Sequence, residues 1–149
     1  MAFDQPSLKG RALRLLSGRE HSRAELVRKL QRFEEEPGSL AAALDDLQAK
    51  GFISEQRVAE SVVNRRSAKL GASRIKQELQ AKGLDPQLVC DAVADLRDTE
   101  LARAQVVWQK KFGSVAEDAT AAARQMRFLA ARGFSGDAIR RVVKQQFSS

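Results

Sequence analysis

The chain has 149 residues, of which 43% are hydrophobic, and its 26 Lys and Arg exceed its 19 Asp and Glu to give a net charge of +7. Cys90 is its single cysteine, which excludes an internal disulfide, and no run approaches the roughly 20 apolar residues of a membrane-spanning helix. Residues 1–7 also lack the apolar core of a signal peptide. We therefore expect a cytoplasmic protein that makes no membrane contact and binds an acidic partner, either nucleic acid or a negatively charged protein groove.

A unit of about fifty residues recurs three times along the chain. Leu30, Leu79 and Leu129 are equivalent anchors, separated by 49 and 50 residues. Apolar residues also recur ten and fourteen positions after each anchor. Since units of this size bury little apolar surface alone, we expect them to pack against their neighbours.

The first unit predicts three helices. The first covers Leu8–Ser17, and the second begins at Ser22, which forms an S-x-x-E capping box with Glu25. After a Pro-Gly turn, Ser39 is expected to cap a third helix that ends before Gly51. The glutamate triplet at 34–36 is interpreted as a solvated turn.

The other two units follow the same plan. Asp85 precedes a proline at a helix start, and Ser114 with Glu117 resembles a second capping box. The expected helices are Glu55–Ala68, Ala72–Ala81 and Pro86–Leu96, followed by Asp98–Phe112, Glu117–Ala131 and Gly136–Gln146. No segment has the alternation typical of a strand. The predicted fold is all-α, with three tandem three-helix repeats over 8–53, 54–97 and 98–147.

The inventory of reactive side chains argues against an enzyme. His21 and Cys90 are each the only residue of their kind, too few for a zinc site or a histidine-activated thiol of the ordinary type. We expect His21 in a surface turn and Cys90 in the core. No glycine-rich phosphate loop matches the known motifs, and we expect no metal and no cofactor.

A first group of cations lies in the second unit, around a short turn. Two helix ends should meet there and bring together Arg65, Arg66, Lys69, Arg74 and Lys76. Attraction of cations to a helix C-terminus is an alternative explanation for Arg65 to Lys69. It does not explain Arg74 and Lys76, so we interpret the group as a binding patch. We expect substitution of Arg74 and Lys76 by glutamate, which reverses their charge, to leave the melting temperature little changed.

A second group of cations makes the third unit the basic one. Residues 99–149 carry nine Lys and Arg but only four Asp and Glu, whereas residues 1–53 carry nine and eight, and residues 54–98 carry eight and seven. The group comprises Arg124, Arg127, Arg132, Arg140, Arg141 and Lys144. A simple solvated face is the alternative. The eight aromatic residues are expected in the core rather than as a stacking surface for bases.

Three pieces of the chain, in order, resemble one family. They are Ala12–Ser17 with His21–Leu26 and Lys29-Leu30; Arg65–Gly71 with Arg74-Ile75, Glu78-Leu79 and Lys82–Leu84; and Phe128-Leu129 with Arg132–Ser135 and Ile139. This pattern resembles the RecX family, bacterial regulators of the RecA recombinase. Residues Val58 and Val62 stand where family members often have aromatics.

The resemblance implies an elongated, curved body of three-helix repeats. It also implies that the protein lodges in the groove of the RecA–DNA filament, lowers its ATP hydrolysis and strand exchange, and so modulates repair, recombination and the SOS response. A monomer is expected, with single- or double-stranded DNA as a further candidate partner. A different hypothesis, from the net charge and the tri-helical units, is a stand-alone DNA-binding protein that inserts a helix into the major groove.

Overall fold

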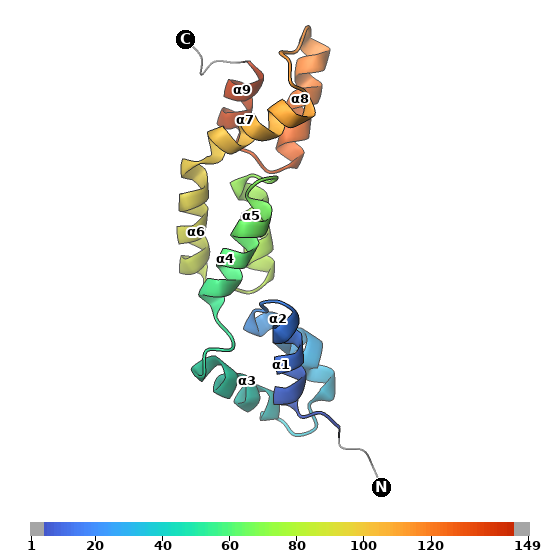
Figure 1. Ribbon diagram of the computed structural model, residues 1–149, viewed down its shortest axis with the longest axis vertical. Helices are drawn as coiled ribbons and strands as arrows, with labels where there is room; N and C mark the ends of the chain where they lie inside the picture. Colours follow the sequence, from blue (N-terminus) through green and yellow to red (C-terminus); the bar gives the residue numbers. More distant parts are fainter. Residues whose placement is uncertain (1–4, 145–149) are drawn as a thin grey trace.

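The computed structural model describes residues 5–144. Within that range the chain forms nine α-helices and one short 3₁₀ helix, with no strand. Their bounds are α1 Leu8–Gly18, α2 Arg23–Leu30, η1 Gln31–Phe33, α3 Ser39–Ala49, α4 Glu55–Arg66, α5 Ala72–Ala81, α6 Pro86–Asp98, α7 Glu100–Lys111, α8 Ala119–Ala131 and α9 Gly136–Val143. Figure 1 shows three helix triplets stacked end to end in an elongated, gently curved body. The predicted fold class is therefore confirmed.

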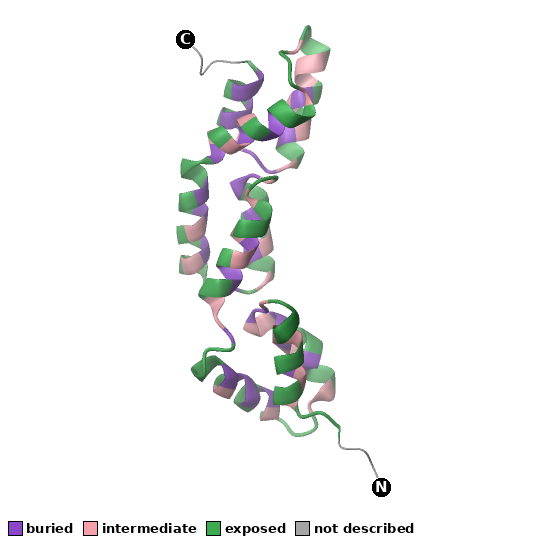
Figure 2. Ribbon diagram, viewed as in Figure 1, coloured by how far each residue is buried: buried purple, intermediate pink, exposed green. Residues whose placement is uncertain are grey.

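Each repeat has its own apolar core rather than a share in one central core. The anchors Leu30, Leu79 and Leu129 are 2%, 0% and 0% exposed and belong to three separate clusters. Val58 and Val62, which stand where the resembled family often has aromatic residues, are buried in the middle cluster. Figure 2 shows the buried faces turned inward within each triplet. The fifty-residue register thus corresponds to three successive hydrophobic cores.

Helix starts follow the sequence signals in most places. Ser22 and Glu25 form the predicted capping box, and Asp85 caps α6 ahead of its proline. Asp118, not the Ser114 box, caps α8, which begins at Ala119 because the Asp118 carboxylate accepts from Ala121 N at 2.8 Å. The predicted start at Glu117 was therefore two residues early.

The start of α3 also differs from the prediction. Ser39 is the first residue of the helix, not its cap, and its hydroxyl donates to Glu36 O. The N-cap is Gly38, whose φ of 88° is readily available to glycine. The Glu34 carboxylate reaches forward along the chain and accepts from Leu40 N at 2.8 Å, so part of the glutamate triplet orders the helix start instead of only facing solvent.

Neighbouring repeats are joined through the same positions twice. In the first joint the Ser22 hydroxyl donates to Lys82 O at 2.6 Å, and in the second Gly71 N donates to Arg132 O at 2.8 Å. Ser22 and Gly71 each precede their anchor by eight residues, while Lys82 and Arg132 each follow theirs by three. The start of the second helix of one repeat therefore docks on the exit turn of the second helix of the next.

Three expectations about burial were wrong. His21 is buried because it lies beneath the first joint, whereas Cys90 is exposed because it faces away from the core next to buried Val89. Phe52, expected in the core, is 48% exposed after the Gly51 turn. The sequence shows where these residues lie relative to the helices, but it does not reveal which other part of the fold covers or exposes each side chain.

Candidate functional site

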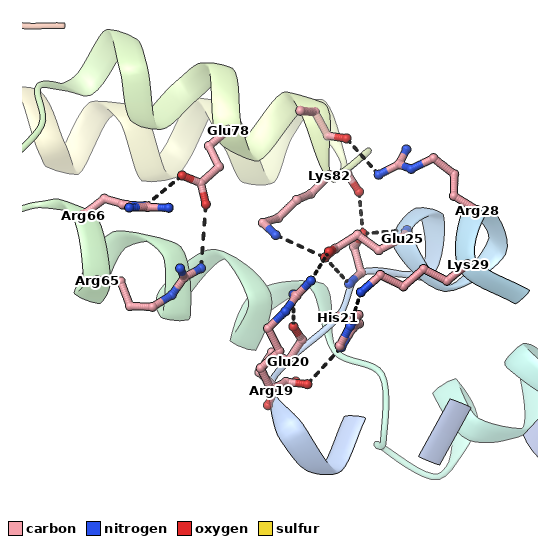
Figure 3. Close-up of polar contacts among 12 residues, drawn as sticks. Arg19, Glu20, His21, Glu25, Arg28, Lys29, Arg65, Arg66, Glu78 and Lys82 are labelled. Atoms are coloured by element: carbon pink, nitrogen blue, oxygen red, sulfur yellow. Dashed lines mark hydrogen bonds and ion pairs between the residues drawn. The ribbon is translucent and has the colours of Figure 1, made fainter. Parts of the chain in front are cut away.

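The cation group of the second repeat is organised by one carboxylate. Glu78 on α5 accepts from Arg66 Nε at 3.0 Å and pairs with Arg65 Nη2 at 3.7 Å, so it bridges the end of α4 (Figure 3). Both arginine side chains are nearly half exposed. Glu78 therefore neutralises part of the predicted patch and holds the two guanidinium groups side by side.

The remaining three cations of this group lie in different surroundings. Arg74 lines the same hollow as Arg66 and Glu78, and its Nη1 donates to Ala131 O at 2.6 Å in the third repeat. Lys76 lines a separate hollow between α5 and α6, together with Arg97. Lys69 and Lys76 are exposed, and within residues 5–144 neither forms an ion pair. The structure brings together Arg65, Arg66 and Arg74 but places Lys76 apart.

The cations of the third repeat carry less compensation. Within the described residues none of the six forms an ion pair with a carboxylate, and all but the half-buried Arg132 are exposed. The Arg132 guanidinium lies over the Phe128 ring at 4.8 Å, while its backbone carbonyl belongs to the joint with Gly71. Arg124 and Arg127 lie on α8, whereas Arg140 and Arg141 lie on α9. This repeat therefore accounts for most of the net positive charge of the chain, +5 of +7.

A buried ionic network at the first joint was not predicted. The Glu25 carboxylate, 7% exposed, accepts from Arg19 Nη2 at 2.8 Å, from Ser22 N at 3.0 Å and from Lys82 Nζ at 3.2 Å (Figure 3). Burial acts to raise the pKa of Glu25, but the donated hydrogen bonds from Arg19, Ser22 and Lys82 outweigh it and lower the pKa to about 2. Glu25 is thus ionised and ties the first repeat to Lys82 of the second.

His21 belongs to the same joint and is neutral. Burial is the main cause that lowers its pKa, and the nearby charges of Arg19 and Lys29 lower it further. Because the Lys29 ammonium can only donate, His21 Nε2 accepts from it at 3.0 Å, and Nδ1 carries the proton donated to Arg19 O at 3.0 Å. The single histidine therefore has a structural position in the first joint.

The second joint has its own buried carboxylate. Glu100, 4% exposed, accepts from Ala72 N at 2.8 Å at the start of α5. Arg103, one turn later, donates to Ser67 O at 3.0 Å and Leu70 O at 2.6 Å. The only sequence signal for Glu100 and Arg103 was their position in the first turn of α7. This signal did not predict burial, because a glutamate in the first turn of a helix is also typical of an exposed surface.

Other kinds of site find no support in residues 5–144. No three or more His, Cys, Asp or Glu side chains gather there in a way that could hold a metal ion. Among the helices of that range, none combines the length and apolar character needed to cross a membrane. The surface features that stand out are the cation groups and the joints that hold them in place.

Comparison with known proteins matches all three repeats to one family. Residues 9–47, 54–93 and 98–143 match the first, second and third three-helix domains of RecX, respectively. The chain is 52% identical to the regulatory protein RecX of Leptothrix cholodnii over 97% of its own length and 93% of that protein. It is 51% identical to the regulatory protein RecX of Herminiimonas arsenicoxydans, covering 97% of this chain and 95% of the relative.

Solved structures agree in fold. A crystal structure of RecX from Lactobacillus salivarius superposes with a TM-score of 0.78 at 22% identity, covering 93% of both chains. Another crystal structure of a regulatory protein RecX gives a TM-score of 0.75 at 21% identity, over 93% of this chain and 71% of that one. From the matched domains and the identity to its relatives, the chain belongs to the RecX family of regulatory proteins.

Proposed function

We propose that this protein binds the RecA recombinase–DNA filament as a monomer in the cytoplasm and inhibits its ATPase and strand-exchange activities. Through that restraint it modulates DNA repair, recombination and the SOS response. The contact is made by the cation groups of the second and third repeats, with DNA phosphates and acidic side chains of the filament as their counterparts. No enzymatic activity of its own and no cofactor is required.

The observation that carries the proposal is the placement of uncompensated cations on two repeats of an elongated body. Lys69 on the second repeat and Arg124 and Arg127 on the third are exposed and lack ion pairs within the described residues. A polymeric partner repeats its anionic groups along an axis, so separated cations engage several subunits at once. Linked weak contacts then give binding far tighter than any single contact.

The test is the rate of RecA ATP hydrolysis on single-stranded DNA, measured with increasing amounts of the protein. We expect inhibition that weakens as salt is raised, since the contacts are between charges. The variants Lys69→Glu and Arg124→Glu/Arg127→Glu should each require more protein for the same inhibition. Lys110→Glu makes the same change at an exposed lysine outside both groups and should inhibit like the unmodified protein.

The result that counts against the proposal is an unchanged ATPase rate at several-fold excess of protein over filament. A stand-alone DNA-binding protein would instead bind naked duplex DNA with base preference in competition between unrelated sequences. Binding of naked DNA without preference would indicate phosphate contacts only. The same protein preparations therefore distinguish the two hypotheses.

A further inference from the structure

The first repeat carries a basic groove that neither the net charge nor the predicted cation groups indicated. It is a hollow of about 790 Å³ beside α1 and the end of α2. Its cationic lining residues are Arg11, Arg14, Arg28, Lys29 and Arg32, and no carboxylate lines it. Residues 1–53 carry a charge of only +1, because eight Asp and Glu offset nine Lys and Arg, so the sequence total did not reveal this local excess of cations.

The groove combines charge with an apolar floor. Pro6 and Leu15 contribute accessible aliphatic surface, and Gly10 adds no side chain, whereas Leu30 lines the hollow from the core and is only 2% exposed. Arg11 and Arg14 are one turn apart on α1, while Arg28 and Arg32 are one turn apart across the end of α2. The cations therefore stand in pairs with helical spacing beside an apolar surface.

Two of the groove's cations remain available within the described residues: the Arg14 and Arg32 side chains form no hydrogen bond there, whereas Arg28 donates to Ala81 O at 3.2 Å and Lys29 to His21 Nε2 at 3.0 Å. The groove lies at the exit of α2, and the corresponding exits of α5 and α8 are where a preceding repeat docks. In residues 5–144 no repeat precedes the first, and none of the five cations forms an ion pair. Glu35 and Glu36 line a neighbouring hollow that shares Arg11 and Arg32, without an ion pair to either.

We propose that this groove binds an acidic amphipathic peptide segment of a partner protein, with apolar side chains on Pro6 and Leu15 and carboxylates on Arg14 and Arg32. A helix presents apolar side chains on one face and acidic side chains one turn apart at its border, which matches the lining. The site is separate from the cation groups assigned to the filament. The inference therefore goes beyond the proposed function and does not depend on it.

The lining favours a peptide over a single nucleic acid strand. Strand binding combines cations with aromatic faces on which bases stack. The only aromatic residue of the groove is Phe33, and its ring is already covered by Arg11 at 3.7 Å and by Arg32 at 4.6 Å. An aliphatic floor suits leucine or isoleucine side chains instead, while the guanidinium groups suit carboxylates equally well.

The experiment measures direct binding of the whole protein, without recombinase. The probe is a fluorescein-labelled peptide of about 15 residues with Leu at helical spacing and Glu at the borders, long enough to form helix on binding. A second peptide has the same composition in scrambled order. We expect the ordered peptide to bind more tightly and to shift the amide NMR signals of Gly10 and Leu15.

Charge reversal then locates the site. Arg14→Glu and Arg14→Glu/Arg32→Glu should weaken peptide binding by at least about fivefold, or ~1 kcal/mol. The Arg14 side chain is exposed and forms no ion pair or hydrogen bond within residues 5–144, and thermal melting checks that each variant is folded. Arg124→Glu is the matched control, because it reverses an exposed, unpaired arginine in the most basic repeat, and it should leave peptide binding unchanged.

Each of the following outcomes would overturn the proposal. One is no binding of the ordered peptide up to about 1 mM, the weakest affinity that still counts as recognition. Another is equal binding of the scrambled peptide, or binding lost with Arg124→Glu but not with Arg14→Glu. The third is an oligo-dT strand of about 12 nucleotides that binds more tightly than the peptide and loses its affinity with Arg14→Glu.

Discussion

Gly71 and Gly133 pack backbone against backbone where the second and third repeats meet. A Cβ built on Gly71 would collide with the Gly133 carbonyl, and a Cβ on Gly133 would collide with the Arg74 side chain. Gly133 also has a φ of 90°, which disfavours any other residue. The hydrogen bond from Gly71 N to Arg132 O depends on this close approach.

Gly71→Ala should therefore weaken the second joint. The added methyl group must push the backbones apart, and such overpacking costs about 1 to 3 kcal/mol of unfolding free energy. Urea unfolding followed by circular dichroism reports the loss of helix over the whole protein. The fluorescence of Trp108, the single tryptophan, reports on the third repeat alone, since it is buried there and donates to Gln125. We expect the two signals to separate in the variant.

Gly18→Ala is the matched control for that substitution. Gly18 is the last residue of α1, and a Cβ there meets nothing within 4 Å. Alanine in a helix should leave stability unchanged or raise it by up to about 1 kcal/mol. Equal destabilisation by both substitutions would mean that the close approach of Gly71 and Gly133 has no energetic importance.

The charge of Glu25 should make the first joint sensitive to acid. Its pKa of about 2 in the folded protein lies below the ordinary 4.5 of an unfolded glutamate. The unfolded state therefore takes up protons first, and the contribution of Glu25 is complete above about pH 4.5 and is lost as the pH falls toward 2. His21 adds to the same trend near neutral pH, since its lowered pKa keeps it neutral when folded while the unfolded side chain becomes protonated.

Glu25→Gln should destabilise the protein at pH 7 by about 2 to 3 kcal/mol, because Arg19 and Lys82 lose the buried carboxylate that they share. The difference from the unmodified protein should shrink as the pH is lowered from 7 to 3 in urea unfolding experiments. Glu35→Gln, at an exposed glutamate, should change neither stability nor its pH dependence. A Glu25→Gln penalty that stayed constant with pH would contradict the lowered pKa.

The sequence predicted the fold well because the fold repeats. The spacing of Leu30, Leu79 and Leu129 identified three cores, and local signals such as the Ser22 box set most helix starts. Local chemistry was insufficient where a distant residue competed. Glu34 serves the start of α3 from outside that helix, so the expected role of Ser39 was wrong.

The candidate site was harder to predict, because charge depends on what lies across a helix crossing. Arg65 and Arg66 are twelve or more residues before Glu78, and only the packing of α4 on α5 brings them to that carboxylate. His21 is covered by a joint that involves Lys82, some sixty residues away. Sequence spacing identified where cations are dense but not which of them are already paired.

Truncation of a core anchor should destabilise the middle repeat. Leu79 is 0% exposed at the centre of its cluster, so Leu79→Ala leaves a cavity and should cost about 2 to 5 kcal/mol. Leu13→Ala removes the same atoms from a leucine that is 37% exposed and should cost under about 1 kcal/mol. Denaturant unfolding of the two variants measures the contrast, and similar losses would refute the assignment of Leu79 to the core.

The variants Arg74→Glu and Lys76→Glu should differ in stability, although the sequence predicted that reversing either charge would leave the melting temperature little changed. Arg74 donates to Ala131 O across the second joint, so Arg74→Glu leaves that carbonyl without its charged donor and places a carboxylate against it. We expect Arg74→Glu to lower the free energy of unfolding by about 1 to 2 kcal/mol. Lys76→Glu should lower it by under about 0.5 kcal/mol, because Lys76 is exposed and forms no ion pair within the described residues. Arg74→Gln keeps a neutral donor, so its stability should lie between those of the unmodified protein and Arg74→Glu.

Since Arg74→Glu lowers stability and alters surface charge together, filament inhibition by that variant must be measured well below its melting temperature. Equal melting temperatures for Arg74→Glu and Lys76→Glu would show that the contact with Ala131 does not stabilise the joint.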